Sequence, residues 1–142
     1  MDSRSTFQYE ILTPQGRLAD GTAVGAVLPA VDGLIGILAR RAPLVAQLAA
    51  GCVTVRLPGG RSEEYFVAGG FAHVRPQGLT VLAEQGAPRE SLDPQAAAAE
   101  LEQARQMPAE TADERQHRRE AIAAAKAKLR AIHKQDSSRR SV

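Results

Sequence analysis

The sequence predicts a mostly β protein with a helical end. We expect an N-terminal antiparallel β-sandwich or barrel in residues 1–88 and a C-terminal antiparallel two-helix hairpin in residues 89–142. Two observations lead to this prediction. Short apolar runs, several with alternating side chains, are separated by frequent turn residues as far as Glu84. From Leu92 onward, alanine-rich helix formers replace the strand formers, and valine is absent until the last residue.

The strands follow from alternation and turns. In residues 7–13, FQYEILT, the side chains of Phe7, Tyr9 and Ile11 fall on one face and the intervening residues on the other. Further runs are TAVGAVLP, LIGIL, LVAQL, CVTVRL, EEYFVAGG, FAHVRP and LTVLAE, and turns are expected at PQGR, at Asp20-Gly21, at PGG and at PQG. Because no helix-length connection lies between these runs, antiparallel pairing is favoured over a parallel sheet.

Two helices are expected after the strands. Ser91 or Asp93 caps the first helix, with Pro94 in its first turn, and Met107 with Pro108 closes it. The second begins near Thr111 or Asp113. It carries an apolar stripe of Ile122, Ala125, Leu129 and Ile132, and an adjoining basic stripe of Arg115, Arg119, Lys126, Arg130 and Lys134. Because alanine buries little area, such a hairpin is weakly held and can detach without unfolding the β domain.

Charge is unevenly distributed along the 142 residues. Residues 113–142 hold nine basic and four acidic residues, a net charge of +5, which leaves −3 for the rest of the chain. A disordered basic tail is expected from about residue 135. The single cysteine, Cys52, and the lack of an apolar signal-type segment at the start fit a reducing compartment.

The chain shows no pattern typical of an enzyme. Its three histidines and Cys52 lack the spacing of a metal site, and neither a nucleophile elbow nor a phosphate-binding glycine loop is present. We therefore expect no catalytic residues and no bound metal. The basic C-terminal half leaves three interpretations open: a nucleic-acid or anionic-surface binder, a solvated helix face, or a site for a protein partner that carries carboxylates. No aromatic residues lie among the basic ones to stack on bases, which disfavours nucleic acid.

The order of the motifs resembles the epsilon subunit of F-type ATP synthases, called delta in mitochondria. The similarity covers nearly the whole chain. The residues that carry it are Phe7–Thr13 with Pro14, Asp20-Gly21, Leu28-Pro29, Asp32–Leu38, Ala42–Val45, Gly51 with Val53–Arg56, Val67–Phe71 with Val74, and Leu79–Glu84.

The resemblance implies a non-catalytic subunit of the central rotor. Its β-sandwich would bind the gamma subunit and the c-ring, and so help couple ion translocation to ATP synthesis. The helical hairpin would be a regulatory element, either folded against the sandwich or extended along gamma into the alpha/beta catalytic hexamer, where it would block ATP hydrolysis. The resemblance also implies a peripheral position at the cytoplasmic face of the bacterial inner membrane, reached only through the complex, and no nucleic-acid partner. The alternative is a free-standing β-sandwich adaptor whose basic helices bind nucleic acid or an acidic surface.

One departure from the family concerns ATP. Many bacterial members bind ATP through a motif in the first helix that reads [IL]-D-x-x-R-A, assisted by arginines in the second helix. Leu92 and Asp93 match the start of this motif, but Ala96 stands in the place of its arginine. Losing one set of charge-assisted bonds costs about 1.5–3 kcal/mol. We therefore expect weak ATP binding or none, and no cofactor.

A second departure from the family lies in residues 32–41. Leu34 replaces a glutamate that the family often carries there, and Arg40 and Arg41 stand where the family has glycine and histidine. We expect Asp32, Gly33, Leu34, Arg40 and Arg41 to form a docking surface for gamma or the c-ring. The alternative is that both arginines are solvated on a loop, where exposed charges contribute little.

Overall fold

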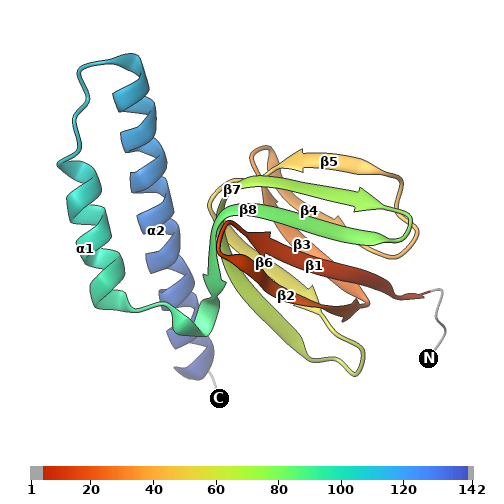
Figure 1. Ribbon diagram of the computed structural model, residues 1–142. Helices are drawn as coiled ribbons and strands as arrows, with labels where there is room; N and C mark the ends of the chain where they lie inside the picture. The colour runs from red at the N-terminus through yellow and green to blue at the C-terminus, as the bar shows by residue number, and fades with distance from the viewer. Residues whose placement is uncertain (1–4, 141–142) are drawn as a thin grey trace. The chain divides into compact units, whose positions relative to one another are not determined.

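The protein is described here by a computed structural model that places residues 5–140, with side chains placed as far as residue 134. The chain forms two compact units, Met1–Pro88 and Arg89–Val142. The first unit is built from strands and the second from helices (Figure 1).

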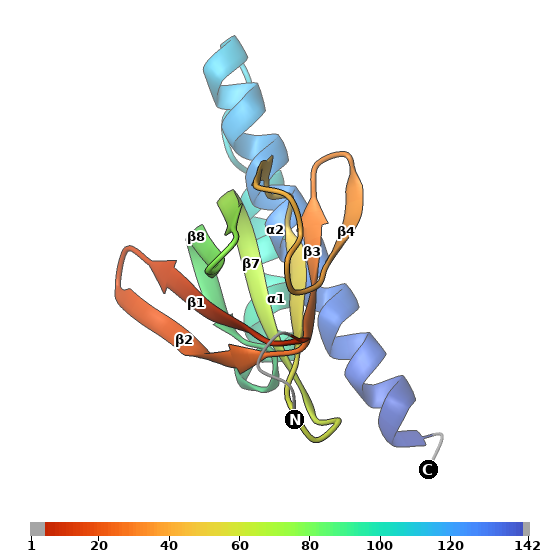
Figure 2. The same cartoon turned by 90° about the vertical axis from the view of Figure 1, so that its right-hand side faces the viewer.

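Eight strands make up the first unit. Their order in the sheet is β2-β1-β8-β7-β6-β3-β4, and β5 pairs with β7 outside this path. In Figure 2, β2 lies at one edge of the unit and the β3–β4 hairpin at the other. The strands are β1 (Phe7–Thr13), β2 (Gly16–Ala23), β3 (Gly25–Ala30), β4 (Gly33–Ile37), β5 (Leu44–Gln47), β6 (Gly51–Arg56), β7 (Ser62–Arg75) and β8 (Gly78–Pro88).

The long strand β7 takes part in both layers of the sandwich. Its first half pairs with β6 and its second half pairs with β5, while β8 accompanies it along most of its length. The change falls at Gly69 and Gly70, which have φ angles of 72° and 104° that only glycine adopts readily. A side chain at Gly70 would place its Cβ 1.9 Å from the carbonyl oxygen of Leu82. The glycine pair therefore lets β7 bend against β8.

Two features differ from the antiparallel pattern expected from the sequence. Strand β1 pairs in parallel with β8, although every other strand pair is antiparallel. The connection between β1 and β8 spans the whole unit and is long enough for a parallel arrangement. The expected turn at Asp20-Gly21 is wrong, because both residues lie inside β2. Gly21 lies opposite Tyr9, whose ring would contact a Cβ there at 3.2 Å.

The alternating residues of the strands form a single apolar core. Phe7, Tyr9 and Ile11 are buried, as their spacing predicts. The largest fully buried side chains are Phe66, Ile11, Leu28, Ile37, Val53, Val55, Val67 and Val81.

Burial raises the pKa of Tyr65, whose hydroxyl donates to the Glu63 carboxylate, so this tyrosine stays neutral and remains a donor.

The second unit is a helical hairpin. It contains a short 3-10 turn η2 (Arg89–Ser91), α1 (Pro94–Arg105) and α2 (Ala112–Arg140). Asp93 caps α1 by accepting from the backbone N–H of Gln95, and Pro94 occupies the first turn. Thr111 and Glu114 form a reciprocal capping box at the start of α2, with bonds of 3.1 Å and 2.9 Å.

The helix α2 is described as far as Arg140 and thus includes residues 135–140, where the sequence analysis expects a basic tail. Residues 141 and 142 lie outside the described part of the chain. Among the described residues, no helix is both long and apolar enough to span a membrane.

Candidate functional site

An exposed apolar surface lies on the outer face of β1, β8, β7 and β5. Its members alternate with buried residues and therefore point away from the core. Leu82 is paired with Leu12 on one side and with Phe71 on the other, so the three side chains lie in one row across the sheet. Val45 lies on the neighbouring strand β5. We call these four residues, Leu12, Val45, Phe71 and Leu82, the outer apolar patch.

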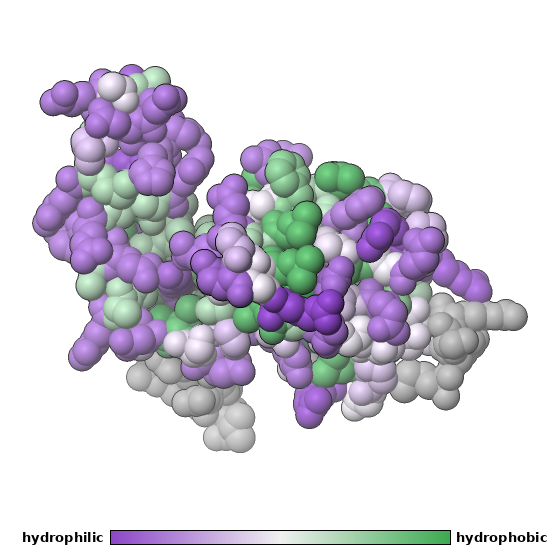
Figure 3. Space-filling model, in the orientation of Figure 1, coloured by the Kyte–Doolittle hydropathy of each residue, from purple (hydrophilic) through white to green (hydrophobic). Residues whose placement is uncertain are grey.

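The outer apolar patch is too exposed to be an ordinary part of a folded core. Phe71 and Leu82 each have 52% of their surface exposed, and Val45 has 63%. A hollow of about 380 Å³ opens beside Leu12, Phe71 and Leu82, lined also by Pro14, Gly70 and Glu84. Figure 3 shows the hydrophobic surface over β7 and β8. A contiguous patch rimmed by polar residues is typical of a protein–protein interface.

The predicted docking residues do not form one cluster. Asp32 lies in the turn between β3 and β4, and Leu34, the next residue but one, is 77% exposed. Arg40 and Arg41 follow the other end of β4. Gly33 and Leu34 begin β4, so the two groups are separated by the rest of that strand, at about 3.3 Å per residue, and by the turn that follows it. If they contact partners, they do so as two separate points along one edge strand.

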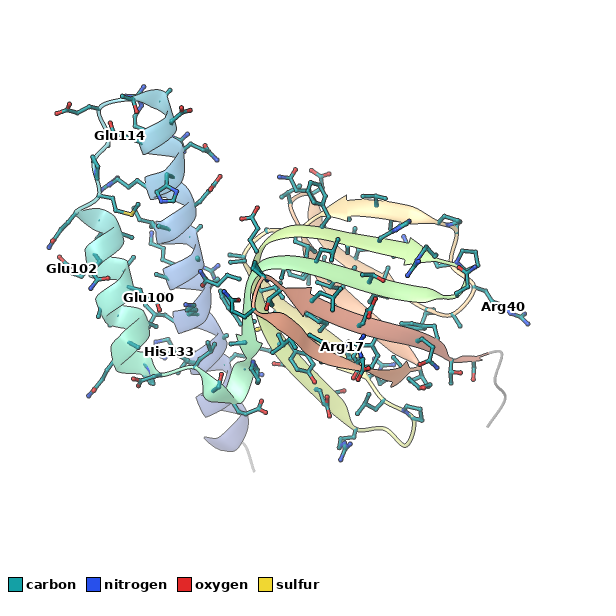
Figure 4. The ribbon with its side chains drawn as sticks, viewed as in Figure 1. Arg17, Arg40, Glu100, Glu102, Glu114 and His133 are labelled. Atoms are coloured by element: carbon teal, nitrogen blue, oxygen red, sulfur yellow. The ribbon has the colours of Figure 1, made fainter. Side chains whose placement is uncertain are left out.

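Arg40 occupies a strained position in the turn after β4. The backbone N–H of Arg41 donates to the carbonyl of Leu38 at 3.3 Å, which closes a β-turn around Ala39 and Arg40. Arg40 has a φ of 66° and is the only non-glycine residue in the described part of the chain with a positive φ. A side chain in this conformation costs about 1–2 kcal/mol. Figure 4 shows the Arg40 side chain pointing away from the sandwich into solvent.

Arg41 has a different role from its neighbour. Its guanidinium donates to the backbone carbonyl of Gly36 on β4. Strand β4 ends the sheet order, and its outer carbonyls have no partner strand. The Arg41 side chain therefore covers part of an open sheet edge, whereas Arg40 is the one that points outward.

Replacing Arg40 with glycine is expected to stabilise the sandwich. Glycine adopts a φ of 66° without strain, which stabilises the folded state. This stabilisation is offset in part because glycine has greater conformational freedom in the unfolded chain. We expect the free energy of unfolding to rise by about 0.5–1 kcal/mol. Arg40→Ala is the matched control because it removes the charge and keeps the strain. If urea unfolding shows the same increase in unfolding free energy for both variants, the positive φ of Arg40 does not destabilise the sandwich.

The basic stripe of the second helix is present and exposed. Arg115, Arg119, Lys126, Arg130 and Lys134 all lie on the solvent-facing side of α2. Arg119 donates to the side chain of Gln116 at 2.7 Å. The apolar stripe lies on another side of the helix, with Ala125 and Ile132 buried and Ile122 and Leu129 half-buried. The buried side of α2 also includes Ala127 and Ala131, which lie outside the predicted apolar stripe.

The remnant of the ATP motif serves the start of α1. Asp93 is used as the helix cap, and Leu92 is half-buried with its backbone N–H donating to the Arg89 carbonyl at 3.1 Å. Ala96, in the place of the motif's arginine, is exposed. No cation is present at this point of the helix to meet a phosphate.

Two arginines of α2 are bound to backbone carbonyls at the end of α1 that lies away from this motif. Arg115 donates to the carbonyls of Ala109 and Glu110 at 3.3 Å and 2.9 Å, and so holds the turn between the helices. Arg118 donates twice to the Arg105 carbonyl at the end of α1, at 3.3 Å and 3.1 Å. If either arginine were to bind a phosphate, it would first have to give up these bonds.

The described residues contain no group of three or more histidine, cysteine or carboxylate side chains placed to hold a metal ion.

The outer apolar patch is not among the sites predicted from the sequence. The run LTVLAE nevertheless indicates this patch. Val81 and Leu82 are both apolar, and adjacent residues of a strand face opposite sides, so Leu82 must lie on the outer face if Val81 is buried.

Comparisons with known proteins agree on one family. Residues 6–88 match the family described as ATP synthase, Delta/Epsilon chain, beta-sandwich domain. The ATP synthase epsilon chain of Brucella anthropi is 37% identical over 99 residues, covering 70% of this chain and 73% of the relative. That of Brucella canis is 35% identical over 115 residues, covering 81% of this chain and 84% of the relative.

Two solved structures share the fold. A chain of the Euglena gracilis mitochondrial ATP synthase, in a structure of OSCP, F1 and c-ring, matches with a TM-score of 0.78 and 24% identity, covering 94% of this chain and 85% of that one. A chain of the Tetrahymena thermophila mitochondrial ATP synthase central stalk and c-ring matches with a TM-score of 0.65 and 12% identity, covering 87% and 96%. With the sequence matches over most of its length, the chain belongs to the ATP synthase delta/epsilon family, among relatives named ATP synthase epsilon chain.

Proposed function

We propose that this chain is a non-catalytic rotor subunit of an F-type ATP synthase, coupling ion translocation to ATP synthesis and restraining ATP hydrolysis through its helices. Its membership of the epsilon-chain family carries the proposal. The solved structures of similar fold come from assemblies described as F1 with c-ring and as central stalk with c-ring. Within such an assembly the subunit works at the cytoplasmic face of a bacterial inner membrane, without entering the bilayer.

The sandwich supplies the permanent contacts with gamma and the c-ring in this proposal. The outer apolar patch is the best supported docking surface, because Phe71 and Leu82 offer apolar area that water does not favour. Asp32, Leu34 and Arg40 supply further contacts along β4. The strain at Arg40 supports a role for it, since residues held in strained conformations cluster at functional sites.

The hairpin supplies the regulatory contact with the alpha/beta hexamer. Its apolar interface is rich in alanine and so is weakly held, while the basic stripe on α2 stays exposed. An extended α2 can then meet carboxylates of the catalytic subunits. The free-standing adaptor is the less favoured alternative, because relatives matching four fifths of the chain are named as ATP synthase subunits.

Co-purification tests the proposed docking. The full chain is expected to bind a cognate gamma subunit and c-ring, and reversing the charges of Arg40 and Arg41 to glutamate should weaken binding several-fold at low salt. The Arg41→Lys variant keeps the charge and serves as a control. Unchanged binding by the reversed variant at low and moderate salt would show that neither arginine contacts a partner. Failure of the unmodified chain to bind would contradict the rotor function itself.

We further propose that the hairpin binds ATP weakly or not at all. Ala96 removes one guanidinium, and Arg115 and Arg118 are engaged with carbonyls of the interhelix turn. Calorimetry of the full chain should detect no binding at micromolar ATP. Ala96→Arg should increase the affinity by about 10- to 100-fold if the missing guanidinium is the main cause. Micromolar affinity in the unmodified chain would contradict this proposal.

A further inference from the structure

The outer edge of β4 presents backbone hydrogen-bonding groups to its surroundings. Strand β4 pairs with β3 in an antiparallel register that sets Pro29 opposite Leu34. Because proline has no N–H, these two residues form a pair without mutual hydrogen bonds, and the N–H and C=O of Leu34 point away from β3. Two residues further on, the N–H and C=O of Gly36 point the same way. The bond from the Arg41 guanidinium to the Gly36 carbonyl agrees with this direction, since β4 ends the sheet order.

The side chains along this edge are apolar and exposed. Leu34 is 77% exposed and Leu38, just after the strand, is 65% exposed. Both lie on the same face as Gly36, because alternate residues of a strand share a face. In Figure 2, β4 lies at the edge of the sandwich. An apolar edge strand with backbone groups that face outward is a site at which another strand can pair.

The sequence of the edge is symmetric about Gly36. Residues 34–38 read Leu-Ile-Gly-Ile-Leu, the same in both directions. If two copies of the chain pair antiparallel with the two Gly36 residues opposite each other, Leu34 of each copy lies opposite Leu38 of the other. Such self-complementarity is what a two-fold contact between identical chains requires.

The charges that flank this segment obey the same symmetry. Asp32 lies four residues before Gly36 and Arg40 lies four residues after it, so the two-fold pairing brings Asp32 of each copy toward Arg40 of the other. Among the described residues, neither has an ion-pair partner within its own chain. The Arg40 side chain points into solvent, as Figure 4 shows. A second copy therefore fits this edge in backbone direction, in side-chain order and in charge.

We propose that the free subunit pairs with a second copy of itself along β4, on a two-fold axis through Gly36, with contacts between Asp32 and Arg40 at both ends of the paired segments. The Gly36 carbonyl then accepts from the Gly36 N–H of the other copy, and the Arg41 guanidinium leaves it. Arg41 therefore competes with the second copy and keeps the pairing weak. This pairing is a property of the chain alone and does not depend on the proposed rotor function.

The dimer has a consequence for assembly. It covers Asp32, Leu34 and Arg40, which the proposed function assigns to contacts with rotor partners. A partner that uses these residues must displace the second copy, so the dimer is a form of the subunit outside the complex.

The variant Gly36→Cys locates the axis by disulfide formation in the full chain. Two residues opposite each other in a hydrogen-bonded antiparallel pair have Cα atoms about 5.5 Å apart, within the range that a disulfide spans. The variant should fold, because a Cβ at this position meets nothing within 4 Å. Under mild oxidation it should form a disulfide-linked dimer at least tenfold faster than Leu82→Cys, a control in the outer apolar patch. The unmodified chain, whose single cysteine is Cys52, gives the background.

Peptide mapping of the linked dimer identifies the joined positions. A disulfide between the two copies of position 36 is the expected result. Faster linkage at position 82 would mean that copies meet through the outer apolar patch, and background rates at both positions would mean that copies do not pair. Protection of Gly36→Cys from a thiol reagent only after gamma is added would assign this edge to gamma. Each of these three results would overturn the proposal.

Charge exchange tests the register without cysteine chemistry. Asp32→Lys sets two positive charges against each other at both ends of the dimer, and Arg40→Asp sets two negative charges there. Each variant alone should associate at least tenfold more weakly than the unmodified chain in sedimentation equilibrium at low salt. An equal mixture of the two variants should regain the dimer, since every contact then joins opposite charges. A mixture that stays monomeric where the unmodified chain is dimeric would contradict the two-fold register.

Removing the competing guanidinium should have the opposite effect. Arg41→Ala leaves the Gly36 carbonyl open to the other copy, so the association constant should rise several-fold in the same measurement. An association constant that is unchanged or lower in Arg41→Ala would overturn the competition between Arg41 and the second copy.

Discussion

Replacing both Phe71 and Leu82 with glutamate is expected to lower the affinity of the subunit for its rotor partners by at least 100-fold. Both side chains lie in the centre of the outer apolar patch, where a buried aromatic residue contributes about 2–4 kcal/mol to an interface. Two carboxylates placed in this contact would have to lose their water without a partner. Pull-down with gamma and the c-ring measures the effect.

Two controls accompany this experiment. The double variant Phe71→Leu and Leu82→Met keeps the patch apolar and should retain binding within about tenfold. Both original side chains are about half exposed, so the glutamate variant should keep the unfolding transition of the sandwich. Full binding by a folded glutamate variant would mean that the rotor partners use another surface.

Replacing Gly70 with alanine is expected to cost the sandwich about 3 kcal/mol or more of unfolding free energy. The φ of 104° is strained for alanine, and the new Cβ would lie 1.9 Å from the Leu82 carbonyl oxygen, so the β7–β8 pairing must shift. The shift would also displace the outer apolar patch, because Phe71 and Leu82 belong to these two strands.

Gly59 provides a matched control. Its φ is 95°, and a Cβ there would meet nothing within 4 Å, so Gly59→Ala isolates the conformational strain of about 1–2 kcal/mol. Urea unfolding followed by tyrosine fluorescence reports on the sandwich alone, because Tyr9 and Tyr65 are the only tyrosines and tryptophan is absent. Equal losses for the two variants would contradict the close contact between Gly70 and Leu82.

Local patterns predicted those features that depend on neighbouring residues. The alternation in residues 7–13 placed Phe7, Tyr9 and Ile11 in the core, and Asp93 with Pro94 marked the start of α1. The spacing of Ile122, Ala125, Leu129 and Ile132 predicted only part of the buried side of α2, which also includes Ala127 and Ala131. These features rest on the repeat of a strand or helix and on capping chemistry, both of which can be read from a single chain.

Features that depend on distant pairing could not be read in the same way. Strand β2 is rich in polar residues and contains Asp20-Gly21, a strong turn signal, yet it pairs with β1 and leaves room for the Tyr9 ring. Arg40 has a positive φ, but the turn lacks the glycine that usually marks this conformation in a sequence. Asp32 and Arg40 lie apart because β4 runs between them. Arg115 and Arg118 donate hydrogen bonds to backbone carbonyls at the interhelix turn, and these bonds depend on how the chain folds there.

The candidate site was therefore only partly predictable. The basic stripe needed nothing beyond helical periodicity, whereas the outer apolar patch required the register of four strands that bring Leu12, Val45, Phe71 and Leu82 onto one face. The ion pair between Lys128 on α2 and Glu100 on α1 joins residues 28 positions apart, so this contact depends on how the two helices pack.

ATP hydrolysis by a catalytic complex, measured with and without this subunit, tests the proposed rotor function most directly. The unmodified chain should bind and lower the rate. A variant with Lys126, Arg130 and Lys134 changed to glutamine should bind equally well through its sandwich but inhibit roughly tenfold less, because the exposed stripe of α2 has lost its charge. A bound, unmodified chain that leaves the hydrolysis rate unchanged would contradict the regulatory role of the hairpin.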